Sequence, residues 1–176
     1  MAEDPAQRAP STTAVAAARR VVVSLSEQSL HLLDSGVTIA VYPVSTAVNG
    51  GGEREGSYKT PRGRHAICEK IGGDAPRGAV FVGRCATGES CTRSAYAAAP
   101  SRDWILSRIL WLEGLEEGIN RGGDVDSRSR YIYIHGTPDE EPIGVARSHG
   151  CVRMRNDDVI AFFDMVAVGT EVEIVE

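Results

Sequence analysis

The sequence predicts a mostly β protein of the α+β class, with one or two helices. Three observations support this. Short β-branched or alternating apolar segments recur along the chain and are separated by turn residues, a pattern typical of strands. One stretch near the C-terminus combines helix-start signals with an apolar helical stripe. The length of 176 residues suits one domain with its own core.

The first expected strands form a meander. Arg20–Leu25 is a continuous β-branched run, and a polar turn at 26–28 separates it from Leu30–Leu33. Asp34, Ser35 and Gly36 then form a second turn before the apolar segment Val37–Val44. We therefore expect two consecutive hairpins at the start of the fold.

The middle of the chain mixes apolar segments with glycine-rich ones. Residues 64–70 and 79–83 predict strands, and 104–112 fits either a buried strand or a short helix, because a short apolar run is ambiguous. Three further segments lack a clear periodicity, and we expect them to be loops: 49–57, which is also expected to be exposed and mobile, 85–100 and 113–130.

One helix is expected after Asn156, which suits an N-cap. Asp157 and Asp158 follow in the first turn, where the helix dipole favours negative charge. An apolar stripe then continues along one face: Val159, Ile160, Phe162, Phe163 and Val166. Gly169 is expected to close the helix, and the alternating segment 171–175 predicts a last strand.

The charge and the apolar pattern exclude two kinds of partner. The formal net charge is -5, and phosphate binding needs a basic surface, so we expect no nucleic acid. No apolar stretch approaches the length of a membrane span, so we expect no membrane partner. Residues 1–18 show no secretory pattern and are expected to be a flexible tail. This favours a cytoplasmic protein, or a periplasmic one if the native N-terminus has been trimmed.

The cysteines favour a reducing compartment. None of the four forms a CxxC pair, and their spacings match no zinc pattern. A free catalytic thiol would leave an odd number for an oxidised framework. A disulfide between Cys85 and Cys91 remains open.

Two segments carry the candidate chemistry: YIYIHGT at 131–137 and SHGCVRM at 148–154. A strand is expected at 130–134, and alternation would place Tyr131, Tyr133 and His135 on one face. An imidazole can take the proton of a neighbouring thiol and later return it to a leaving amine. We therefore expect Cys151 as the nucleophile and His135 as its base, provided that the fold brings them together.

The residues around Cys151 fit the same chemistry. Gly150 allows unusual backbone angles, and the N–H groups of Gly150 and Cys151 could form an oxyanion hole. Ser148 could steady this loop through a hydrogen bond. His149 could stack under the loop, position Cys151 or contact substrate, and a structural role is slightly favoured.

Further candidates line the expected pocket. Arg153 could bind a substrate carboxylate or form a local ion pair, and Tyr133 and Gly136 are candidates for substrate contact. The acidic run 139–141 is either a solvated loop or a contact for a substrate ammonium group. A metal bound by His135, His149 and Cys151 would lack a fourth ligand and the usual paired spacing, so we expect neither a metal nor a cofactor.

These segments resemble a known family. A His-Gly followed by Ser-His-Gly-Cys-x-Arg is similar to the L,D-transpeptidase catalytic domain of the YkuD type. Thr60-Pro61-Arg62-Gly63 also resembles the upstream TPxG element of that family. The resemblance extends over about residues 20 to 175, so we assign 19–176 to the catalytic domain. It implies a β-sandwich or barrel-like fold.

The resemblance also implies a reaction. The thiol would attack the carbonyl of the third residue, usually meso-diaminopimelate, in a peptidoglycan tetrapeptide or muropeptide, and the terminal D-alanine would leave. Water as acceptor would make an L,D-carboxypeptidase of murein recycling, which the sequence favours. An amine acceptor would make a transpeptidase forming 3-3 crosslinks. A carbapenem is an expected covalent inhibitor. A non-catalytic peptidoglycan-binding module is the alternative from another class.

Overall fold

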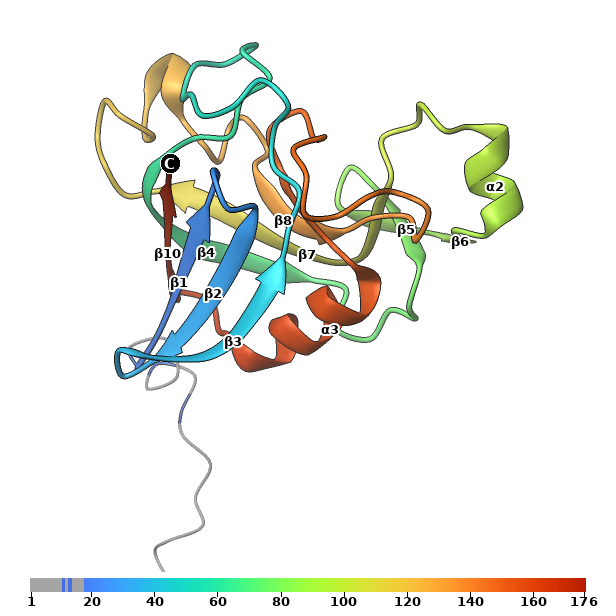
Figure 1. Cartoon of the computed structure of the whole chain (residues 1–176), viewed down its shortest axis with the longest axis horizontal. Helices are drawn as coiled ribbons and strands as arrows, with labels where there is room; N and C mark the ends of the chain where they lie inside the picture. Colours follow the sequence, from blue (N-terminus) through green and yellow to red (C-terminus); the bar gives the residue numbers. More distant parts are fainter. Residues whose placement is uncertain (1–10, 12, 14–17) are drawn as a thin grey trace, which may run out of the picture.

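The computed structural model describes residues 11, 13 and 18–176 (Figure 1). Its strands are β1 (Arg19–Ser24), β2 (Ser29–Asp34), β3 (Val37–Pro43), β4 (Gly63–Ile71), β5 (Ala79–Val82), β6 (Cys85–Ser90), β7 (Ile105–Gly114), β8 (Tyr133–Gly136), β9 (Val152–Met154) and β10 (Glu171–Val175). Its helices are α2 (Arg93–Ala98) and α3 (Asn156–Met165), with a 3-10 turn at Gly123–Val125. The predicted mostly β, α+β class is confirmed. Most of the expected tail lies outside the described residues.

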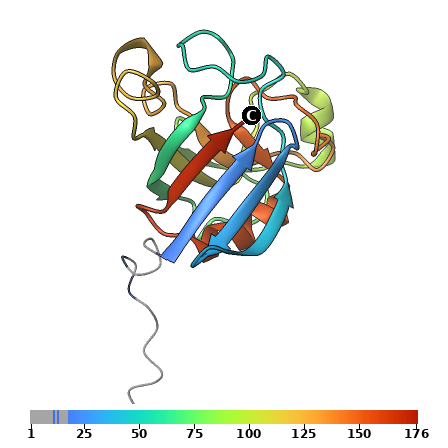
Figure 2. The ribbon, with the colours of Figure 1, turned by 60° about the vertical axis from the view of Figure 1, so that its left-hand side comes forward.

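The strands form one mixed sheet in the order β3-β2-β1-β10-β4-β7-β5-β6, and β8 pairs with both β7 and β9. The pairs β1–β10 and β8–β9 are parallel, and the remaining ladders are antiparallel. The first and last strands therefore lie side by side, next to β2 and β3 (Figure 2). The two predicted N-terminal hairpins are confirmed by the antiparallel β1–β2 and β2–β3 ladders.

The two ends of the sheet enclose a common core. Val21 and Val23 of β1 pack in the same apolar cluster as Leu110 and Leu112 of β7, and Phe162 of α3 also belongs to it. Each fully buried side chain of this kind stabilises the fold by roughly 1.5–3 kcal/mol. The sheet thus folds over itself, with α3 against β7 and β8, as in a sandwich or a barrel.

The prediction of a loop at 85–100 is wrong. This segment forms β6 and α2. All six residues of β6 are exposed, so the strand has no apolar alternation that could reveal it. The α2 helix is short and buries none of its residues, and Thr92 caps it by accepting a hydrogen bond from the Ala95 N–H at 3.1 Å. In the ambiguous run 104–112, all residues after Trp104 belong to the strand β7.

The C-terminal helix begins and ends differently from the prediction. Arg155 is the N-cap, and Asn156 is already helical because its buried side chain binds Ser107 and Thr137 instead of the helix end. The helix ends at Met165, well before Gly169, which lies in the following turn at φ +90°. The two first-turn aspartates are in place.

The described residues contain neither a membrane-spanning helix nor a disulfide bond. No helix within residues 11, 13 and 18–176 is long and apolar enough to cross a bilayer. Cys68, Cys85, Cys91 and Cys151 are all free thiols, so the possible Cys85–Cys91 disulfide is absent.

Candidate active site

The floor of the site is the short parallel pair β8–β9. Ile134 pairs with Val152 and His135 with Arg153, so Cys151, just before β9, lies beside Tyr133. The predicted strand at 130–134 is displaced, because Tyr131 adopts φ +55° and β8 begins only at Tyr133. In this register Cys151 lies diagonally across from His135 on the neighbouring chain segment, and both residues line one cleft.

The Cys151 thiol is held by backbone groups. It donates a hydrogen bond to the Tyr131 carbonyl at 3.4 Å and accepts one from the Tyr133 N–H at 3.3 Å. The left-handed turn at Tyr131 is what aims its carbonyl at the sulfur. The resting thiol is therefore bound to backbone rather than to the imidazole, and it must leave the Tyr131 carbonyl to react.

The His135 imidazole is oriented by its own strand. Nδ1 lies 2.7 Å from the Gly136 carbonyl oxygen. A carbonyl only accepts, so Nδ1 carries the proton and Nε2 is left as the basic nitrogen. The ring is buried, with 1% of its surface exposed, and it lines the same cleft as Cys151. This geometry suits a base that faces the nucleophile's cleft.

Burial keeps both groups uncharged. It lowers the pKa of His135 to about 4, against the opposing effect of the Gly136 carbonyl. It also raises the pKa of the Cys151 thiol to about 12, although the Tyr133 N–H and the nearby Arg153 and Arg130 act in the opposite direction. Burial thus favours the neutral forms of both groups, a thiol and a neutral imidazole, over an ion pair.

The nucleophile loop is fixed by two hydroxyl groups. Ser148 Oγ donates to the Cys151 carbonyl at 2.6 Å and accepts from the Gly150 N–H at 3.2 Å. Thr60 Oγ1 donates to the Gly150 carbonyl at 2.9 Å and accepts from the Ala47 N–H at 3.0 Å. Gly150 itself adopts φ +142°, which favours glycine. Thr60 thus ties the upstream TPxG element directly to the nucleophile loop.

Only one of the two expected oxyanion donors is free. The Gly150 N–H is occupied by Ser148 Oγ. Within residues 18–176, the Cys151 N–H has no protein acceptor. An unpaired donor beside the sulfur is what a developing oxyanion requires.

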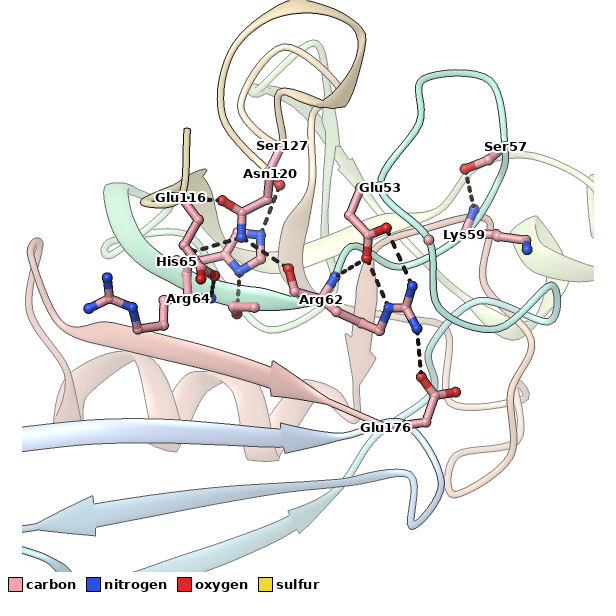
Figure 3. Close-up of polar contacts among 12 residues, drawn as sticks. Glu53, Ser57, Lys59, Arg62, Arg64, His65, Glu116, Asn120, Ser127 and Glu176 are labelled. Atoms are coloured by element: carbon pink, nitrogen blue, oxygen red, sulfur yellow. Dashed lines mark hydrogen bonds and ion pairs between the residues drawn. The ribbon is translucent and has the colours of Figure 1, made fainter. Parts of the chain in front are cut away.

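The TPxG element is anchored on its far side as well (Figure 3). The Arg62 guanidinium pairs with Glu53 at 2.9 Å and with Glu176 at 3.2 Å. The Asn120 amide donates to the carbonyls of Arg62 and Arg64, each at 3.0 Å. The exposed ion pairs add little stability on their own, but the backbone-directed bonds from Asn120 fix the course of the chain after Thr60.

A cleft of about 630 Å³ opens over Cys151 and His135. The side chains of Tyr133 and Arg153, both predicted substrate contacts, line it. A smaller cleft of about 240 Å³ adjoins it. Three residues line both clefts, Asp103, His149 and Arg153, so the two spaces meet next to the site.

Three further predicted residues can now be placed. Arg153 lines the cleft, and no carboxylate lies within ion-pair distance of it among residues 18–176. His149 is exposed on the cleft wall and meets Tyr58 edge-on at 6.0 Å between ring centroids, so it does not stack under the loop. Gly136 does not line the cleft. A Cβ there would come within 2.6 Å of Leu106 O and Asn156 Oδ1, so this glycine serves packing instead of substrate contact.

Sequence reasoning missed three charged residues of the cleft: Asp103, Arg84 and Arg130. Arg130 donates to the carbonyls of Gly52, Glu53 and Lys59, which ties the glycine-rich loop 49–57 to the cleft. Arg84 and Asp103 lie in a hairpin tip and a loop, where no periodicity marks a residue as inward-facing.

Each side chain of the acidic run 139–141 meets a partner within the chain, and Glu141 also lines the smaller cleft. Asp139 pairs with Arg77 at 3.0 Å, and Glu141 accepts from the Tyr96 hydroxyl at 2.6 Å. Glu140 lies 3.7 Å from Arg93. In the described part of the chain, no group of three or more His, Cys, Asp or Glu side chains is arranged to hold a metal ion.

Comparison with known proteins agrees with this geometry. The family model of the L,D-transpeptidase catalytic domain matches residues 18–174. "Probable L,D-transpeptidase ErfK/SrfK" of Salmonella typhimurium is 49% identical over 47 residues, which are 27% of this chain and 15% of that protein. YqjB of Bacillus subtilis, whose name also refers to an L,D-transpeptidase, is 45% identical over 56 residues, or 31% and 32% of the two chains.

Solved structures share the fold. An L,D-transpeptidase from Mycobacterium tuberculosis H37Rv matches with a TM-score of 0.55 at 18% identity, over 90% of this chain and 58% of that one. The L,D-transpeptidase LdtMt1, solved in complex with imipenem, matches with a TM-score of 0.53 at 21% identity, over 90% and 59%. This chain spans less than a third of the length of the two sequence relatives and about three fifths of these structures.

Proposed function

Because this chain belongs to the L,D-transpeptidase catalytic domain family, we propose that it cleaves the L,D bond before the terminal D-alanine of peptidoglycan tetrapeptide stems through a thioester on Cys151. The observation that supports this most is the shared cleft, in which a backbone-held thiol and a neutral imidazole face the same space. The family resemblance supplies the substrate, with meso-diaminopimelate as the third residue.

The reaction begins from the neutral pair. Cys151 Sγ attacks the carbonyl carbon of the third residue while its proton passes to His135 Nε2. The carbonyl oxygen becomes an oxyanion beside the free Cys151 N–H, and one such donor is worth about 3–4 kcal/mol in a studied enzyme. The imidazolium then protonates the D-alanine amine, the C–N bond breaks, and a thioester remains.

The acceptor of the acyl group decides the activity. The adjoining cleft, lined by charged residues such as Arg147 and Glu141, offers a path to the thioester for a second stem. This favours an amine acceptor and hence transpeptidation. Hydrolysis by water, the carboxypeptidase activity that the sequence favours, stays the competing prediction. A cytoplasmic role in recycling likewise stays a prediction that cell fractionation would test.

The test uses free tetrapeptide with and without a second stem as amine acceptor, followed by mass spectrometry. Release of D-alanine with a crosslinked dimer supports transpeptidation, and D-alanine with tripeptide alone supports hydrolysis. Cys151→Ala should abolish both, whereas Cys68→Ala, which removes a free thiol that does not line the cleft, should not. Incubation with a carbapenem should add one adduct mass to the wild type and none to Cys151→Ala. No D-alanine from any stem would refute the proposed function.

A further inference from the structure

Arg84 is held at the rim of the cleft by aromatic groups. It occupies the tip of the β5–β6 hairpin, and its side chain lines the space over Cys151. The guanidinium carbon lies 4.6 Å from the centroid of the Trp111 ring and 5.2 Å from that of Tyr131. One of its nitrogens donates to the Tyr133 hydroxyl at 3.1 Å. These contacts fix the direction of a side chain that is otherwise flexible.

The backbone of Arg84 is also in an unusual conformation. Its φ is +66°, in the left-handed region that non-glycine residues rarely adopt. Two other residues that line the cleft, Tyr58 and Tyr131, share this feature with φ +55° each. Strained residues of this kind concentrate at functional sites, where the surrounding structure fixes the direction of the side chain.

The charge around Arg84 is unbalanced. Within residues 18–176, no carboxylate lies within ion-pair distance of its guanidinium. The cleft is lined by Arg84, Arg130 and Arg153 against the single acid Asp103, although the whole chain carries a net charge of -5. A cleft with excess positive charge in an acidic protein attracts anions.

The free donors of Arg84 match a planar anion. A guanidinium has five N–H donors, and the Tyr133 hydroxyl uses one nitrogen. The remaining fork fits a carboxylate with two parallel hydrogen bonds, whereas a carboxamide offers only one acceptor oxygen and no charge. Arg84 lies at the Tyr131 end of the cleft, while Arg153 lies at the His135 end. The two arginines therefore reach different parts of a bound stem.

We propose that Arg84, clamped by Trp111, Tyr131 and Tyr133, forms a carboxylate-binding subsite that selects stems with a free carboxylate on the third residue over their amidated counterparts. This inference rests on the proposed function. It assigns a binding role to a residue outside the nucleophile loop and its histidine.

The test compares kcat/KM for D-alanine release from two tetrapeptides that differ only in the side-chain group of the third residue, carboxylate or carboxamide. The wild type should prefer the carboxylate stem on the order of tenfold in kcat/KM. This is the low end of the range for a charge-assisted hydrogen bond, because Arg84 is partly exposed and solvent weakens the interaction. Arg84→Gln should remove this preference, because it should lower kcat/KM about tenfold more for the carboxylate stem than for the amidated stem. Arg84→Lys, which keeps the charge but not the fork, should retain part of it.

Arg128→Gln is the matched control. Arg128 also lies over the Trp111 ring, at 5.3 Å, but it does not line the cleft, so this variant should keep the wild-type preference. A larger loss with the carboxylate stem than with the amidated stem in Arg84→Gln would separate the loss of the subsite from a general disturbance around Cys151. An equal loss with both stems, or equal wild-type turnover of both, overturns the subsite. Absence of D-alanine release from either stem would instead refute the proposed function itself.

Discussion

Replacing Thr60 with valine tests how the TPxG element supports the nucleophile. Thr60 is fully buried, and its hydroxyl joins the Ala47 N–H to the Gly150 carbonyl, one residue before Cys151. Valine keeps the shape of the side chain and removes only the hydroxyl. The variant therefore leaves one donor and one acceptor of buried backbone without partners.

The magnitude follows from those two groups. An unsatisfied buried backbone group costs about 1–3 kcal/mol. The added methyl group returns roughly 0.8 kcal/mol if it is accommodated. We expect the free energy of unfolding to fall by about 1–5 kcal/mol, which corresponds to roughly 2–20 °C in Tm for a domain of this size. The freed Gly150 carbonyl should also let the Cys151 loop drift, so acylation should slow on the order of tenfold or more.

The measurements are urea unfolding and the rate of carbapenem acylation by intact mass. Thr170→Val is the matched control, because Thr170 is equally buried and its hydroxyl accepts from the Ala167 N–H far from the cleft. It should lose stability but acylate at the wild-type rate. The reasoning fails if Thr60→Val unfolds within 0.5 kcal/mol of the wild type, roughly the scatter of a neutral substitution. It also fails if the two variants acylate equally fast.

Three further predictions concern stability and the nucleophile loop. Burial lowers the pKa of His65 and of His135 to about 4 from 6.5, so the unfolded chain binds more protons between these values. The free energy of unfolding should therefore fall as the pH is lowered from 6.5 to 4, by up to roughly 3 kcal/mol per histidine, and a flat urea midpoint over this range would contradict it. Gly136→Ala should destabilise the fold by about 1–3 kcal/mol in the same assay, because its Cβ would press on Leu106 O, and an unchanged midpoint would show that β7 and β8 can separate at little cost. Ser148→Ala should lower the carbapenem acylation rate, since it frees both the Cys151 carbonyl and the Gly150 N–H, and an unchanged rate would mean that Thr60 alone holds the loop.

The apolar pattern was enough to predict the strands that have one buried face. In β10, Val172 and Ile174 are buried and alternate with partly exposed residues, and in β1 Val21 and Val23 are buried on either side of the partly exposed Val22, so composition and period agree with burial. The pattern carried no information about β6, whose side chains are all exposed and whose strand is specified by its pairing with β5. Pairing of this kind depends on residues distant in the sequence, which no local window contains.

In the candidate site, too, the sequence predicted some features and not others. The sequence motif pointed to Cys151 and His135, and the structure places both in one cleft. It could not predict that the Tyr131 carbonyl would hold the thiol, because this depends on one left-handed backbone angle. The prediction of Asn156 as an N-cap is wrong for a similar reason. Its side chain forms buried hydrogen bonds with Ser107 and Thr137, which are distant in the sequence, instead of bonding the N–H groups of the helix end.

The low pKa of His135 has opposite effects on the two halves of acyl transfer. Its Nε2 is a weak base, so removing the thiol proton is costly and must accompany the attack of Cys151 on the carbonyl. The resulting imidazolium, buried and near Arg153, is a strong acid for the same reason. It therefore gives its proton readily to the departing amine. An amide releases its amine only when that nitrogen is protonated, so burial of the imidazole favours bond cleavage at the expense of thiol activation. The free Cys151 N–H then has to compensate for the first half by stabilising the oxyanion that forms as the proton leaves the sulfur.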